Sequence, residues 1–200
     1  MGMHITQQAS AYIEGLWVWL ADHDIDHNNS TQITVFSGRG IYSESAGPVW
    51  LIGTGSEHHV LYQYNLVGAE DHFLSLIQTE SPYFQPAPAA PAPFKSECLY
   101  DDPTDFPAGY AWALRVHDSE NVLVYGAGQY SFFDNYSQDC IPERSCQEQI
   151  VDIASDSENV HIFTLSTVAT DHMLSVDGKP IIKQSDNVYG FQSTAVKWEL

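Results

Sequence analysis

The chain has few basic residues, few cysteines and no long apolar run. It carries 7 lysines and arginines against 26 acidic residues over 200 positions, a formal net charge of −19. A surface of this sign repels phosphate backbones and anionic lipids, so we expect neither a nucleic-acid nor a membrane partner. No segment approaches the roughly 20 apolar residues of a membrane span. A neutral glycan or a protein is the natural partner.

The N-terminal stretch MGMHITQQASAYIEG lacks the basic and apolar regions of a secretory signal peptide. Cys140 and Cys146 bracket a short loop, IPERS, which a disulfide closes in an oxidising compartment. Cys98 is then left over, either as a buried thiol or with a partner outside this chain. N-glycosylation sequons, which matter only for a secreted chain, begin at Asn28, Asn29 and Asn135.

Helical periodicity is missing, because no stretch of a dozen residues shows a convincing 3.6-residue repeat. Short runs rich in β-branched and alternating apolar residues recur instead, such as QITVFS, VWLIGT, HFLSLIQT and NVLVYGA. Glycine, asparagine, aspartate and serine interrupt these runs at intervals of roughly ten residues. The sequence therefore predicts an all-β chain of many short strands.

The chain also contains an internal repeat. The segment DSENV at 118–122 returns at 156–160, and a looser echo, GAEDHFLSLIQTE, begins at Gly68. Each unit is a polar turn followed by an apolar strand, which is typical of a solenoid. We predict one domain over residues 1–200, a right-handed parallel β-helix with coils of about 20–25 residues. A β-sandwich is the alternative.

Most of the ten prolines fall between residues 82 and 107. Proline cannot donate to a strand ladder, so this segment is no interior strand. We predict a stiff loop excursion, rich in polyproline II conformation, that lies against the flank of the solenoid. Long loops of this kind often wall a binding site.

Two glutamates, Glu57 and Glu80, lie 23 residues apart. In a β-helix this is about one coil, so the two side chains would stack on neighbouring strands about 4.8 Å apart. Two carboxyl groups so close do not both ionise easily, and the pKa of one should rise. A proton-bearing carboxyl beside an ionised one is what glycosidic bond cleavage requires. The alternative is a coincidence among 26 acidic residues, with both glutamates as solvated charges.

Aromatic residues crowd the first half of the chain, and sugar rings stack on such surfaces. For Trp50 and Tyr62 we favour packing in the core. The other aromatic residues of this group are candidates for a sugar-binding surface: Trp17, Trp19, Tyr64, Tyr83 and Phe84.

Histidines and aspartates gather in two motifs that can resemble metal sites. These are ADHDIDH, with His23, Asp24, Asp26 and His27, and SEHH, with His58 and His59. Neither matches HExxH or a calcium-binding loop, and adjacent histidines on a strand point to opposite faces. We expect no metal and no organic cofactor. Ser56 next to these histidines lacks the GxSxG context of a nucleophile.

Several uncommon stretches occur in an order that resembles glycoside hydrolase family 55, the exo-β-1,3-glucanases (laminarinase-like enzymes). They are WVWLADHDID, FSGRGIYSESAGPVWLIGTGSEHHVLYQYNL, IQTESPYFQPAPAAPAPF and GAGQYSFFDNYSQDC followed by CQEQIVDI. The resemblance implies two tandem right-handed parallel β-helices of the pectate-lyase type. This chain corresponds to the C-terminal β-helix portion only.

The resemblance also implies a secreted enzyme that releases glucose from β-1,3-glucan, such as laminarin, with inversion and without a cofactor. Glu80 falls on the general acid of the family, and Glu57 on a second carboxylate that holds the attacking water. Tyr83, Trp17 and Trp19 fall where the family lines a sugar subsite.

The chain departs from the family in its length. The first β-helix is missing, so we expect half of the site and an N-terminal β-helix half as a partner. Two other functions stay open: a glucan-binding remnant without turnover, and a structural β-helix module whose carboxylates are surface charges.

Overall fold

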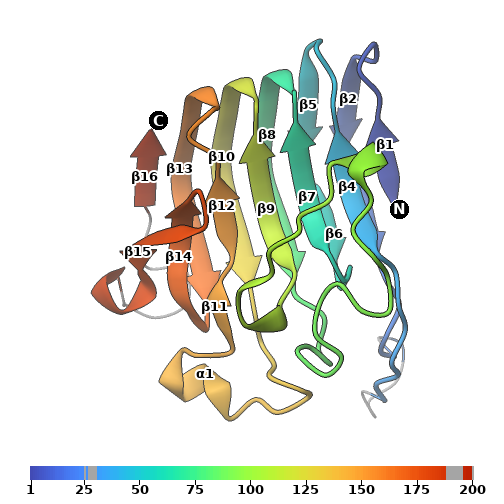
Figure 1. Cartoon of the computed structure of the whole chain (residues 1–200), viewed down its shortest axis with the longest axis vertical. Coiled ribbons are helices and arrows are strands. Elements are labelled where there is room, and N and C mark those ends of the chain that lie inside the picture. Colours follow the sequence, from blue (N-terminus) through green and yellow to red (C-terminus); the bar gives the residue numbers. More distant parts are fainter. Residues whose placement is uncertain (25, 27–30, 188–195, 200) are drawn as a thin grey trace.

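The computed structural model describes residues 1–24, 26, 31–187 and 196–199 (Figure 1). In these ranges the regular secondary structure is mainly β-strand. It also includes one short α-helix, α1 (Cys140–Glu143), and 3-10 helices, one of them at Gln184–Asn187. The strands are β1 (Met3–Ile5), β2 (Ala11–Glu14), β3 (Trp17–Trp19), β4 (Arg39–Ser43), β5 (Val49–Ile52), β6 (Gly55–Glu57), β7 (Tyr62–Val67), β8 (Glu70–Glu80), β9 (Trp112–His117), β10 (Glu120–Tyr130), β11 (Gln147–Gln149), β12 (Val151–Ile153), β13 (Glu158–Val168), β14 (Thr170–Val176), β15 (Lys179–Lys183) and β16 (Val196–Glu199). The predicted all-β class is confirmed.

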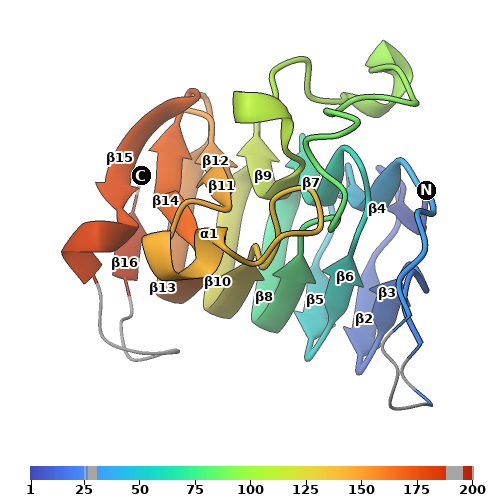
Figure 2. The ribbon, with the colours of Figure 1, turned by 90° about the horizontal axis from the view of Figure 1, so that it is seen from below.

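The strands form two sheets that lie in two rows (Figure 2). One has the order β1-β4-β7-β9-β12-β14-β11, with β15 beside β14. The other has the order β2-β5-β8-β10-β13-β16; β6 also pairs with β8, and β3 pairs with β6. Among the described strands, pairing is parallel except for β14–β15 and β13–β16. The chain thus alternates between two parallel sheets, which is consistent with a β-helix-like fold and excludes the antiparallel sandwich.

The sequence repeat lies in register. Glu120 pairs with Glu158 and Val122 with Val160, so the two DSENV units stack directly on each other. The looser echo stacks on them as well, since Glu70 pairs with Glu120. The predicted turn-and-strand repeat is therefore a spatial repeat across β8, β10 and β13.

A bend recurs at equivalent places of the second sheet, where the backbone takes a positive φ. The five residues at this bend are Gly15, Gly53, Leu76, Gly126 and Thr164. A glycine adopts this conformation without strain, whereas Leu76 (φ 54°) and Thr164 (φ 61°) are held in it by the pairing on both sides. The strands continue after the bend. Five successive register partners there form one row on the outer face of the sheet: Trp17, Gly55, Gln78, Gly128 and Ser166.

The core lies between the sheets and consists of stacked aliphatic side chains. Leu51, Leu74, Val124 and Ile162 are successive register partners, and each is fully buried. Burying one such side chain stabilises the fold by about 1.5–3 kcal/mol. Tyr62 is buried as predicted.

The core interpretation of Trp50 is wrong, because its side chain is 42% exposed. Trp50 lies between the buried Val49 and Leu51 on β5, and alternation along the strand turns it outward.

The proline-rich segment contains turns and two 3-10 turns, at Cys98–Tyr100 and Pro107–Gly109, and no strand. Phe84 lies in a second buried cluster with Tyr62 and Trp112, against which Phe94 and Phe106 pack. Arg39 at the start of β4 forms an ion pair with Asp102, and its Nε donates to Asp102 Oδ1 at 2.7 Å. These contacts hold the loop beside β4, β7 and β9.

Cys140 and Cys146 form a disulfide that closes the loop containing α1. Cys98 is a free, exposed cysteine, so the buried-thiol alternative is wrong. Asn135 is exposed, whereas His27, Asn28 and Asn29 lie outside the described residues. Within the described ranges, no helix has the length and apolarity that crossing a membrane requires.

Candidate active site

Glu57 and Glu80 lie side by side at the ends of β6 and β8. They are direct register partners in a parallel ladder, so the predicted stacking on neighbouring strands is confirmed. Both line a cavity of about 450 Å³. Its other lining residues are Gly15, Leu16, Trp17, His23, Gly53, Thr54, Gly55, Leu76, Gln78 and Tyr83.

The carboxyl group of Glu57 is buried and held on both oxygens. Trp17 Nε1 donates to Oε2 at 2.8 Å, and Gln78 Nε2 donates to Oε1 at 2.9 Å. Burial raises the pKa of Glu57, and the charge of Glu80 raises it further, against the opposing effect of the two donors. A raised pKa at Glu57 agrees with the rise that the pairing of the two carboxyl groups predicts.

The carboxyl group of Glu80 is 19% exposed and contacts two donors through one oxygen. Tyr83 Oη donates to Oε2 at 2.8 Å, and His58 Nε2 lies 3.3 Å from the same atom. Both contacts involve the same oxygen, Oε2, and Glu80 lines the cavity.

His58, which the sequence suggests only as a metal candidate, belongs to this site through its contact with Glu80. It follows β6 directly, takes a positive φ of 67°, and is fully buried. Its Nδ1 lies 2.9 Å from Asp22 Oδ2, so the ring stands between the carboxylates of Asp22 and Glu80. Burial lowers the pKa of His58, but the two carboxylates outweigh it and raise the pKa to about 9. The ring is therefore an imidazolium at neutral pH.

His59 has a different environment from its neighbour. Its ring contacts Ser37 Oγ at 3.0 Å and the carbonyl of Val18 at 3.3 Å, away from Glu80. Burial lowers its pKa to about 4. The predicted divergence of the two side chains holds, and the second histidine is neutral.

Among the residues that the structure describes, Asp22, His23 and His58 are grouped with a spacing that could hold a metal ion. Their potential ligand atoms all lie within 4.8 Å of one another. Both carboxylate oxygens of Asp22 already pair inside the trio, Oδ1 with His23 Nδ1 at 2.8 Å and Oδ2 with His58. Asp22 thus holds the two rings by one hydrogen bond, to His23, and one ion pair, to His58.

The three predicted sugar-contacting aromatics lie at the site in different roles. Trp17 lines the cavity and is 50% exposed, whereas Trp19 stacks against Trp17 with ring centroids 4.8 Å apart. Tyr83 also lines the cavity, but its ring is mostly covered. The ring centroids of His58 and Phe133 lie 4.5 and 4.1 Å from the centroid of the Tyr83 ring. Trp17 offers the stacking face, and Tyr83 offers its hydroxyl to Glu80.

Comparison with protein-family profiles finds no match. Among curated proteins, the chain is 40% identical over 97% of its length to a probable glucan endo-1,3-beta-glucosidase of Arthroderma benhamiae. It is 42% identical over 96% of its length to a glucan 1,3-beta-glucosidase of Cochliobolus carbonum. These similarities support a β-glucanase family.

A further relative has a different kind of name. The chain is 41% identical over 98% of its length to a protein of Penicillium expansum named non-secreted LysM effector LysM15. The chain spans 22% and 25% of the two glucosidases and 13% of this third relative.

Proposed function

We propose that this chain carries the carboxylate pair of a glycoside hydrolase that cleaves β-1,3-glucan from a chain end with inversion. The observation that carries the proposal is the in-register pair of Glu57 and Glu80 in a cavity that Trp17 also lines. Its similarity to proteins named as 1,3-beta-glucosidases supports the substrate class. The fold that we propose is one right-handed parallel β-helix over residues 1–200, of the pectate-lyase type found in glycoside hydrolase family 55.

Glu80 is the general acid in this proposal. Tyr83 and His58 both contact its Oε2, so the carboxyl group is held in position at the cavity, where it can transfer a proton to the leaving glycosidic oxygen. Trp17 supports the sugar by stacking, because its exposed ring lines the same cavity.

Glu57 takes part in holding the attacking water. Each of its oxygens accepts one protein donor, and a carboxylate oxygen offers a second acceptor site that a water can use. Inverting enzymes place their two carboxyl groups about 6.5–9.5 Å apart, which is more than one strand spacing of about 4.8 Å. Glu57 therefore acts within a hydrogen-bonded network that includes Trp17 and Gln78, rather than as a lone base.

A glucan-binding protein without turnover is the second candidate. It is favoured by the relative named as a LysM effector, whose name describes no hydrolase. In both cases we propose an extracellular setting, because the disulfide between Cys140 and Cys146 is stable in an oxidising compartment.

The test is glucose release from laminarin by the purified chain at mildly acidic pH, with the anomer identified by NMR. We expect α-glucose from the wild type and a rate lower by about 10²–10⁴-fold for Glu80→Gln. Glu70→Gln is the matched control, since Glu70 is exposed at the opposite end of β8. Equal rates for both variants would exclude Glu80 as the acid. Retardation in a laminarin gel without glucose release would favour the binding protein.

A further inference from the structure

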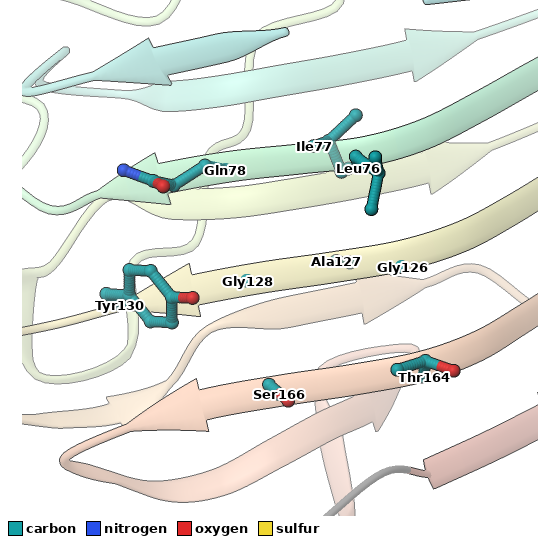
Figure 3. A pocket seen from close by; sticks show the side chains of 9 residues that line it. All are labelled: Leu76, Ile77, Gln78, Gly126, Ala127, Gly128, Tyr130, Thr164 and Ser166. Carbon is teal, nitrogen blue, oxygen red and sulfur yellow. The ribbon is translucent and has the colours of Figure 1, made fainter. Parts of the chain in front are cut away.

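A second cavity lies beside the candidate active site on the same sheet. It has a volume of about 240 Å³ and is formed by β8, β10 and β13 (Figure 3). Figure 3 shows Gly126, Ala127 and Gly128 on the middle strand, between the β8 residues on one side and the β13 residues on the other. The full lining is Leu76, Ile77, Gln78, Gly126, Ala127, Gly128, Tyr130, Thr164 and Ser166.

The second cavity repeats the backbone rows of the first. Gly128 is the register partner of Gln78, and Tyr130 is the register partner of Glu80. Leu76 and Gln78 line both cavities, so β8 forms a shared wall between them. The two cavities are therefore consecutive parts of one trough that runs across the strands.

Glycine keeps the second part of the trough open. A Cβ atom at Gly128 would lie 2.2 Å from Tyr130 Oη, because the Tyr130 side chain folds back over this position. A Cβ atom at Gly126 would lie 3.2 Å from Leu76 Cδ2. Larger residues in this row would force the Tyr130 ring aside and fill the space.

The chemistry of the second cavity differs from that of the first in one respect. Tyr130 stands where the first cavity has Glu80, and the lining contains no carboxylate and no histidine. The polar groups of the lining are the amide of Gln78 and the hydroxyl groups of Tyr130, Thr164 and Ser166. The rest is apolar surface, including Leu76, which is 70% exposed. Amide and hydroxyl groups beside apolar surface suit an uncharged ligand with hydroxyl edges and apolar faces, such as a sugar ring.

We propose that the second cavity binds a further glucose unit of the same β-glucan chain, while the first cavity holds the unit that is cleaved. This inference rests on the proposed function and adds a subsite that binds but cannot catalyse, because it lacks a carboxylate pair. The bound chain crosses the wall formed by Leu76 and Gln78. Gln78 then links the two parts, since its amide also donates to Glu57.

The experiment is calorimetric titration of the Glu80→Gln chain with β-1,3-linked oligosaccharides of two to six glucose units. We expect the dissociation constant to fall by about tenfold between the short and the long oligosaccharides, as one or two added hydrogen bonds and ring contacts would give. Ser166→Trp and Thr164→Trp, each made in the Glu80→Gln background, fill the second cavity. Each should remove this gain and leave the shortest oligosaccharide unaffected within twofold.

Ser75→Trp is the matched control, because Ser75 lies on β8 across the bend and lines neither cavity. Affinity that does not change with length, or a gain that both blocking variants retain, would overturn the second subsite alone. Failure of every oligosaccharide to bind would overturn the subsite together with the proposed function. Thr164 is exposed, so its variant keeps the test valid if Ser166→Trp does not fold.

Discussion

The charge on His58 makes a sharp prediction about stability and pH. The ring is fully buried between Asp22 and Glu80, and its pKa is raised from 6.5 to about 9. A group whose pKa is raised by folding stabilises the folded state below its unfolded pKa, and this contribution is lost as the pH rises through the folded pKa. Each unit of difference corresponds to about 1.4 kcal/mol, so His58 should contribute about 3 kcal/mol at pH 6 and lose most of it by pH 9.

The perturbation is His58→Asn, which removes the charge and tolerates the positive φ. The free energy of unfolding, measured by urea denaturation with the disulfide intact, should be about 3 kcal/mol lower than in the wild type at pH 6. The difference should shrink steadily toward pH 9. His59→Asn is the control with the opposite sign. Folding lowers the pKa of His59 to about 4, so the folded state loses a proton that the unfolded state holds near pH 6, and removing this ring should not reproduce the loss seen for His58→Asn. A gap between wild type and His58→Asn that stays constant from pH 6 to 9 would refute the buried imidazolium.

Two further predictions follow from single contacts. Trp17→Phe removes the indole donor to Glu57 Oε2 and keeps an aromatic face. The pKa of Glu57, followed by NMR of its labelled carboxyl carbon, should therefore rise. An unchanged titration would show that this donor does not help to set the pKa. Replacing Cys140 and Cys146 by serine opens a loop with a sequence separation of 6. This should lower the free energy of unfolding by about 2 kcal/mol in denaturant titrations. Cys98→Ser is the control and should have no effect, because that thiol is free and exposed.

Local patterns were sufficient for the strands and for one part of the site. The DSENV repeat and the alternating apolar runs predict stacked parallel units, and the register of β8, β10 and β13 has that arrangement. The separation of Glu57 and Glu80 matches one such unit, which is why their contact could be predicted without a structure. Spacing along a repeat converts directly into position, because each unit adds one strand to the sheet.

Other features depend on where separate segments meet in space. His58 and Asp22 are 36 positions apart, in motifs that show no metal or catalytic pattern, and only the positive φ after β6 turns the ring between the two carboxylates. Burial raises the pKa of Glu57, and the spacing of the two glutamates does not reveal that burial.

The sequence by itself thus determined the class of structure, the stacking of its repeats and the pairing of Glu57 with Glu80, since these follow from local periodicity. Tertiary structure alone decided that Trp50 faces outward, that His58 bridges Asp22 and Glu80, and that glycines leave a trough beyond Gln78. The physical reason is that exposure, charge burial and empty volume are properties of the packed whole. No single segment carries them.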